Sequence, residues 1–210
     1  MAESIDNQFS FTVPVVMTFP NLIEPRVVGK KGATGKPKFG ASFLFAADSA
    51  DLVAIKALAA RVAREKWAGR AFTELKFPFE NGDAVYAKKP EKNEHLKGKV
   101  ILKARSLYQP KLGSFATGKL VEYSTPAAIL AAKDQFYAGA EALAQVSLVA
   151  YEGVGGNQDG VTAYLASVCV TGKGTRIAGG GQSMAEAFKG YVGAASAEDP
   201  TGAAGDEIPL

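Results

Sequence analysis

Cysteine and histidine are almost absent from this sequence. Cys169 is the single thiol and His95 the single imidazole among 210 residues. One cysteine excludes an intramolecular disulfide framework, and one cysteine with one histidine cannot form a tetrahedral zinc site. Cys169 lies in an apolar run typical of buried small side chains, and His95 lies in a charged segment where an ordinary surface role is favoured over a phosphate or base contact. We therefore expect an intracellular protein of a reducing compartment, without disulfides.

Long apolar runs are also missing. No segment approaches the roughly 20 apolar residues that cross a bilayer, and the acidic start over residues 1–6 lacks the apolar stretch of a secretory signal. Neither Gly35-Lys36 nor Gly172-Lys173 has the flanking residues of a phosphate-binding P-loop, and no Gly-x-Gly-x-x-Gly pattern occurs. We expect a protein without a cofactor that is neither exported nor bound to a membrane.

One acidic pair leaves an enzymatic interpretation open. Glu80 and Asp83 flank the turn-forming Asn81-Gly82 and could hold a divalent cation, as in a metal-dependent nuclease. A turn with capping carboxylates is the favoured interpretation of these residues. We predict no metal site and no catalytic activity.

The hydrophobic pattern predicts strands in both halves of the chain, with helices between them. Strands are expected over residues 9–19, 38–45, 100–108, 145–151 and 161–170, the last two forming a hairpin. Apolar residues at helical spacing indicate a helix over 49–67, and shorter helices are expected over 126–136 and 183–191. The mixture favours a mainly β fold, a small β-barrel with inserted helices, over alternating β/α units.

Basic residues gather in two acid-poor segments. Residues 26–38 contain five Lys or Arg, three glycines and no acid, and residues 88–119 contain nine Lys or Arg against Glu91 and Glu94. Tyrosine and phenylalanine lie among or beside the basic residues of the second segment. Cations that neutralise phosphates, interleaved with rings that stack on unpaired bases, indicate nucleic-acid binding, whereas the structural alternative is a solvated face with core aromatics.

The end of the chain has the opposite charge. Residues 194–210 contain four acids and no Lys or Arg, so their removal takes the formal charge from +3 to +7. We expect a disordered acidic tail over 194–210, following a folded domain over 1–193. Such a tail can compete with a polyanion for the basic body and can serve as a handle for partner proteins. Its partner-binding end is predicted at Asp206, Glu207, Ile208, Pro209 and Leu210.

Several turns and strand edges follow one another in a characteristic order. They are Asn21-Leu22-Ile23-Glu24-Pro25, Lys38-Phe39-Gly40-Ala41-Ser42-Phe43, Phe77-Pro78-Phe79-Glu80-Asn81-Gly82-Asp83, Gly98 to Tyr108-Gln109-Pro110, Phe136-Tyr137-Ala138-Gly139 and Ala150-Tyr151. In these segments, over about residues 10–193, the chain resembles the single-stranded-DNA-binding proteins of tailed phages, which are built on an OB-fold. The tail is similar to those of bacterial and phage single-strand-binding proteins, although Leu210 stands where those tails end in an aromatic residue.

The resemblance implies a non-catalytic protein that coats single-stranded DNA with little sequence preference during phage DNA replication, recombination and repair. It also implies that replication and recombination proteins bind the tail, in the cytoplasm of the infected bacterial host. A homodimer is possible, and the sequence does not decide it. The alternative function is that of a virion structural or assembly protein whose basic loops meet acidic partners.

Candidate DNA contacts follow from the two basic segments. Phosphate contacts are predicted for Lys30, Lys31, Lys36, Lys38, Lys97, Lys99, Lys103, Arg105 and Lys111. Base stacking is predicted for Phe39, Tyr108, Phe115 and Tyr151. The strand register, which decides which of these rings face outward, cannot be derived from the sequence.

Overall fold

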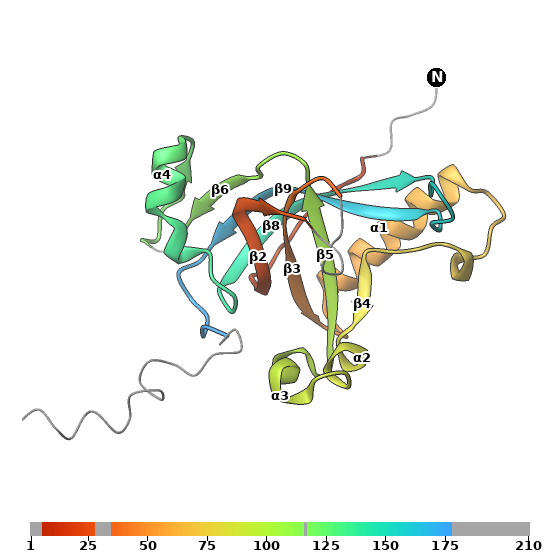
Figure 1. The fold of residues 1–210 in the computed structure, drawn as a ribbon, viewed down its shortest axis with the longest axis horizontal. Helices are drawn as coiled ribbons and strands as arrows, with labels where there is room; N and C mark the ends of the chain where they lie inside the picture. The colour runs from red at the N-terminus through yellow and green to blue at the C-terminus, as the bar shows by residue number, and fades with distance from the viewer. Residues whose placement is uncertain (1–5, 28–34, 116, 178–210) are drawn as a thin grey trace, which may run out of the picture. The chain divides into compact units, whose positions relative to one another are not determined.

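A computed structural model describes residues 6–27, 35–115 and 117–177 (Figure 1). These residues belong to a compact unit spanning Met1–Gly179. The predicted helix over 183–191 and the predicted acidic tail lie outside the described residues.

Five strands close into a barrel. They are β2 (Val15–Arg26), β3 (Lys38–Ala46), β5 (Lys99–Ser106), β9 (Gly160–Val170) and β8 (Glu141–Tyr151), in this order around the barrel, and β8 pairs again with β2. β5 and β9 are parallel, and the other pairs around the barrel are antiparallel. Numbered along the chain, the order around the barrel is first, second, third, fifth and fourth, which is the five-stranded OB topology. The predicted OB-fold barrel is therefore confirmed.

Four short strands extend this barrel. β1 (Gln8–Ser10) pairs with β8, β4 (Phe79–Asn81) pairs with β5, and β6 (Lys111–Ser114) runs parallel to β9 and pairs with β7 (Val121–Tyr123). The chain between β3 and β5 contains α1 (Ala50–Lys66), α2 (Gly82–Tyr86) and α3 (Pro90–Asn93), and α4 (Pro126–Ala131) precedes β8. Short 3₁₀ turns occupy Phe72–Glu74, Glu94–Leu96 and Lys133–Gln135. Among the described residues, no helix has the length and apolar character to span a membrane.

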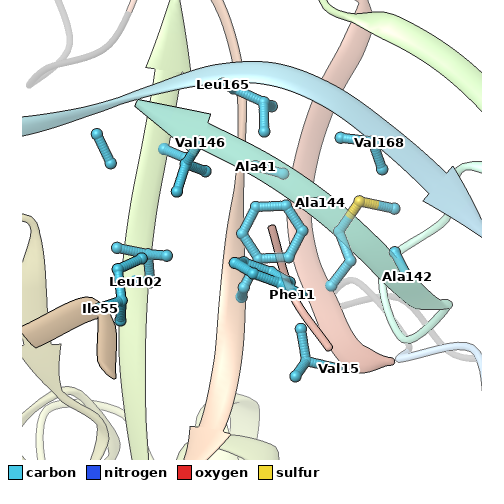
Figure 2. Close-up of a cluster of buried hydrophobic side chains, with 14 of the residues drawn as sticks. Phe11, Val15, Ala41, Ile55, Leu102, Ala142, Ala144, Val146, Leu165 and Val168 are labelled. Carbon is cyan, nitrogen blue, oxygen red and sulfur yellow. The ribbon is translucent and has the colours of Figure 1, made fainter. Parts of the chain in front are cut away.

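Large and small side chains together fill the inside of the barrel (Figure 2). The Phe11 ring packs edge-on against the rings of Phe43 and Phe45, with centroid distances of 5.0 and 5.1 Å. Buried alanines on β3, β5, β8 and β9 leave room for these rings. A small barrel is filled by side chains in this way, so its interior is a packed core and the outer surface of its strands is what a ligand can reach.

The helix α1 covers part of this core. Leu52, Ile55, Ala59 and Val62 are buried at the spacing that the sequence predicts, so the expected helix is confirmed. Asp51 in its first turn is also buried, and its carboxylate accepts hydrogen bonds from the Thr12 backbone N–H at 2.8 Å and the Thr12 hydroxyl at 2.6 Å. This buried carboxylate fixes the chain between β1 and β2 to the start of α1.

The single strand predicted over residues 9–19 is wrong in its extent. The chain leaves the sheet after Ser10, because Phe11 enters the core and Asp51 holds Thr12, and β2 begins only at Val15. β2 then continues beyond Pro20 to Arg26 through irregular pairing with β3, and Phe19 has a positive φ of 49°. A bulge of this kind accommodates a proline that cannot donate to the ladder.

Candidate nucleic-acid interface

Two adjoining hollows lie on the outer surface of the barrel strands. Their volumes are about 540 Å³ and 310 Å³, and Lys38, Lys103 and Arg105 line both. We call the two hollows together the basic groove. The charged and aromatic residues that line it are Lys38, Lys76, Lys103, Arg105, Glu80, Phe19, Phe39, Phe77, Tyr151 and Tyr164.

Strand alternation on β5 gives the groove its charge. Leu102 and Ala104 are fully buried in the barrel core, so Lys103 and Arg105 point to the opposite side. On one neighbouring strand Arg105 pairs with Gly40, and on the other it pairs with Tyr164. A glycine, a guanidinium and a phenol ring therefore lie in one row across β3, β5 and β9.

Gly40 allows the backbone of β5 and the first carbons of the Arg105 side chain to approach β3 closely. A Cβ atom at position 40 would stand 2.6 Å from the Ala104 carbonyl oxygen and 3.0 Å from Cγ of Arg105, so a side chain here would displace the backbone or the arginine. Burial against this surface lowers the pKa of the Arg105 guanidinium. None of the ion pairs between described residues includes Arg105 or Lys38. A partly desolvated cation without a counter-charge favours an anionic ligand.

Lys103 has a different environment from Arg105. Its ammonium forms an ion pair with the carboxylate of Glu80 on β4, and its backbone N–H donates to the Pro78 carbonyl at 2.9 Å. Among the described residues that line the groove, Glu80 is the only acid. The groove thus combines four cations with one carboxylate.

The wall around Lys76 is held by the end of the β8–β9 hairpin. The Lys76 N–H donates to the Asp159 carbonyl at 2.9 Å, and the Lys76 carbonyl accepts from the Val161 N–H at 2.8 Å. The Asp159 carboxylate accepts from the Gly153 N–H at 2.7 Å and from the Arg70 guanidinium at 2.6 Å. The Gly153 hydrogen bond and then the arginine lower the pKa of Asp159. This network fixes Lys76 beside the groove.

Aromatic rings border the cations. Tyr151 and Tyr164 line the larger hollow, and burial, with a smaller contribution from the Asp159 charge, raises the pKa of Tyr151. Phe19 and Phe39 line the smaller hollow. The side chains of Phe19 and Tyr164 are about half exposed, at 56% and 45%. Exposed rings next to cations offer faces on which unpaired bases can stack.

The structure brings part of the predicted contact set into this groove. Lys38, Phe39, Lys103, Arg105 and Tyr151 line it. Lys76, Phe19, Phe77 and Tyr164 also line the groove, and they were not predicted from the sequence. Tyr164 had a readable signal, because Val161, Ala163 and Leu165 alternate as inward residues and place Tyr164 outward.

Other predicted contacts do not line the groove. The Lys97 ammonium is 5.7 Å from the Tyr86 ring centroid, and Lys99 lines a separate hollow with Lys56 and Asp83. Four more predicted residues, Lys36, Tyr108, Lys111 and Phe115, do not line the groove either.

Lys111 and Phe115 line a hollow over β6, β8 and β9, together with Cys169. Tyr108 is 82% exposed in the loop after β5, and Lys36 is exposed before β3. Lys30, Lys31 and the predicted tail contacts Asp206 to Leu210 lie outside the described residues.

The acidic pair considered for a metal makes contacts within the protein. Glu80 pairs with Lys103, and the Asp83 carboxylate accepts a hydrogen bond from the N–H of Gly98, fifteen residues further along the chain, at 2.7 Å. The side chain that caps this turn is Asn81, whose Oδ1 accepts from the Asp83 N–H at 2.8 Å. Within the described ranges, no group of three or more His, Cys, Asp or Glu is placed to hold a metal ion. Burial lowers the pKa of His95 and raises that of Cys169.

Several solved structures of phage proteins share this fold. A single-stranded DNA-binding protein from bacteriophage Enc34, in complex with ssDNA, matches with a TM-score of 0.63 and 20% identity, over 82% of this chain and 90% of that chain. Another structure of the Enc34 protein matches with a TM-score of 0.61 and 16% identity, over 87% of this chain and 90% of that chain. The bacteriophage T7 protein gp2.5, also a single-stranded DNA binding protein, matches with a TM-score of 0.52 and 12% identity, over 95% of this chain and 98% of that chain.

Comparison of sequences gives the family. None of the curated proteins matches this chain. A family model described as the ssDNA-binding protein of Enterobacter phage Enc34 matches residues 11–200, nearly the whole sequence. The chain therefore belongs to the Enc34 family of phage ssDNA-binding proteins.

Proposed function

We propose that this protein binds single-stranded DNA in the basic groove, with little sequence preference and without catalysis. The observation that carries the proposal is the row of Gly40, Arg105 and Tyr164, in which an unpaired, partly buried cation lies beside an exposed ring. Membership of the family supports it, and so does the Enc34 neighbour that was solved with ssDNA.

The groove suits a flexible single strand. Lys38, Lys76 and Arg105 attract successive phosphates, and the cations of the DNA atmosphere are released when these phosphates bind. Tyr151 and Tyr164 stack on bases, and each stack contributes about 1 to 3 kcal/mol irrespective of base identity. Backbone contacts and stacking both tolerate any sequence, because neither reads the hydrogen-bonding edge of a base.

In the phage life cycle, we propose that the protein coats single strands during DNA replication, recombination and repair in the cytoplasm of the infected host. Its acidic end, residues 194–210, recruits replication and recombination proteins and competes with DNA for the cations. The support for this role is the charge of the segment, four acids without a Lys or Arg, and its apolar end Ile208-Pro209-Leu210.

Titration with labelled oligonucleotides tests this function. Full-length protein is titrated at several salt concentrations with an unstructured single strand and with a duplex of the same length. We expect salt-sensitive binding of the single strand, stronger than that of the duplex, and intact DNA after prolonged incubation with magnesium. Absence of salt-sensitive binding at low ionic strength would overturn the proposal and favour the assembly protein.

The same titration on a protein that lacks residues 194–210 tests the tail. We expect tighter binding of single-stranded DNA, because the deletion removes four carboxylates that compete for the groove. Unchanged or weaker affinity at matched salt would exclude competition by the tail and leave binding by the groove intact.

A further inference from the structure

Glu80 is an unusual residue for a surface that binds a polyanion. It is the only acidic residue among the described residues that line the basic groove, and its carboxylate contacts the Lys103 ammonium. A phosphate that contacts the Lys103 ammonium must also come close to the Glu80 carboxylate, and the two negative charges repel each other.

Strand pairing fixes the position of this carboxylate. Glu80 lies opposite Ile101 on β5, and Lys103 is two residues further along β5 on the same face. The Pro78 carbonyl accepts the Lys103 N–H, so the chain just before β4 is also held to β5. The ion pair is therefore part of the sheet geometry rather than a chance contact of long side chains.

Partial burial distinguishes this pair from the other lysine pair of the described residues. The side chains of Glu80 and Lys103 are 34% and 40% exposed, whereas those of Glu152 and Lys66 are 70% and 50% exposed. Water and salt screen an exposed pair more effectively than a partly buried one. Lys103 is consequently less available to a phosphate than Lys38 or Arg105, which have no acidic partner in the described ranges.

We propose that Glu80 is a resident anion of the DNA groove, which occupies Lys103 in the free protein and restrains the contribution of this lysine to DNA binding. The inference rests on the proposed function. Glu80 then limits both the affinity and its salt dependence, which keeps a coating protein displaceable by the enzymes that use the strand.

Four proteins test the inference: wild type, Glu80→Gln, Lys103→Gln and the double variant. Glutamine keeps the shape of glutamate and removes the charge. Affinity for an unstructured oligonucleotide is measured from 50 to 200 mM salt, and melting curves verify that each variant folds. Glu152→Gln is the matched control, because it removes the same charge from a lysine pair that lies outside the groove.

We expect Glu80→Gln to tighten binding and to steepen the slope of log K against log salt by about 0.7, the value for one phosphate contact on a single strand. With this change in slope, the ratio of variant to wild-type affinity should be about 2.6-fold larger at 50 mM than at 200 mM salt. Lys103→Gln should change the slope little when Glu80 is present, and by about 0.7 when Glu80 is replaced. Glu152→Gln should match wild type.

Two results would overturn the inference alone while DNA binding persists. One is an affinity of Glu80→Gln equal to that of Glu152→Gln. The other is an equal effect of Lys103→Gln on the slope in both backgrounds, which would show charge acting at a distance and not through the ion pair. Absence of binding by all the proteins would instead overturn the proposed function, and this inference with it.

Discussion

Replacing Lys38 and Arg105 together by glutamine tests whether the groove holds phosphates. Both cations line the two hollows, and neither has an acidic partner among the described residues. Their removal therefore does not leave an unpaired carboxylate, as removal of Lys103 would leave Glu80. The double variant isolates the contribution of free cations to DNA binding.

The expected magnitude follows from the number of contacts. Each phosphate contact on a single strand contributes about 0.7 to the slope of log K against log salt, so the loss of two contacts flattens the slope by about 1.4. Between 50 and 200 mM salt, a slope difference of this size changes the ratio of wild-type to variant affinity by about sevenfold. The deficit of the variant should be largest at low salt and similar for all base sequences.

Folding stability should change in the opposite direction from binding. Burial lowers the pKa of Arg105, which means that the folded protein disfavours the charged guanidinium relative to the unfolded chain. A charged group whose folded-state pKa is depressed in this way reduces stability at neutral pH. Arg105→Gln should therefore melt at the same temperature as wild type or at a higher one, although it binds DNA more weakly.

Fluorescence titration at several salt concentrations, together with thermal melting, measures both effects. The control carries Lys133→Gln and Lys173→Gln, which remove two exposed charges outside the groove. An unaltered slope in the Lys38 and Arg105 variant, or an equal change in the control, would refute the assignment of the groove. A melting temperature of Arg105→Gln far below that of wild type would refute the argument that the buried charge of Arg105 reduces folding stability.

Three further changes test other parts of the structure. Tyr164→Ala should weaken DNA binding by about 1 to 3 kcal/mol and Tyr164→Phe should not, because stacking needs the ring and not the hydroxyl; equal losses in titration would contradict this. Asp51→Ala should lower the free energy of unfolding by about 2 kcal/mol in urea denaturation, since Thr12 loses two hydrogen bonds to a buried carboxylate, and a smaller loss in Asp51→Asn is the control. Asp159→Asn should lower the melting temperature at pH 7. The folded-state pKa of Asp159 is below its ordinary 3.8. The difference in melting temperature between wild type and Asp159→Asn should therefore persist down to about pH 3.8 and vanish as the pH falls through the folded-state pKa. A difference that does not change with pH in this range would argue against the network.

The regular parts of the fold were accessible from the sequence because their periodicity is local. The helix α1 and the hairpin of β8 and β9 have repeating apolar positions that only one secondary structure can bury. Only the first part of β2 could be predicted from the sequence, because a proline such as Pro20 usually ends a strand and the bulge that lets β2 continue beyond it is not visible in the sequence. β6 and β7 are too short for a period, and their positions depend on pairing with β9.

The candidate site was accessible only in part because charge along a sequence does not reveal faces. Lys99, Lys103 and Arg105 occupy the same face of β5, but Ile101 separates Lys99 from the other two, and Lys99 lines a separate hollow. The identification of Tyr164 needed the register between β5 and β9, which joins segments far apart in the chain. Pairing between strands far apart in the sequence therefore decides which of these residues line the groove.

The groove and the closure of the barrel depend on the same strand contacts. Arg105 can face Tyr164 only when the chain returns through β8 and places β9 parallel to β5, and its close approach to β3 depends on the missing side chain of Gly40. The row of Gly40, Arg105 and Tyr164 therefore needs strands from both halves of the sequence. Single-stranded DNA bound in the groove as proposed would contact β3, β5 and β9, so we expect it to recognise the closed barrel and not the unfolded chain. Binding and folding are then thermodynamically linked, because DNA that binds only the closed barrel raises the free energy of unfolding by RT ln(1 + c/Kd), where c is the concentration of free DNA.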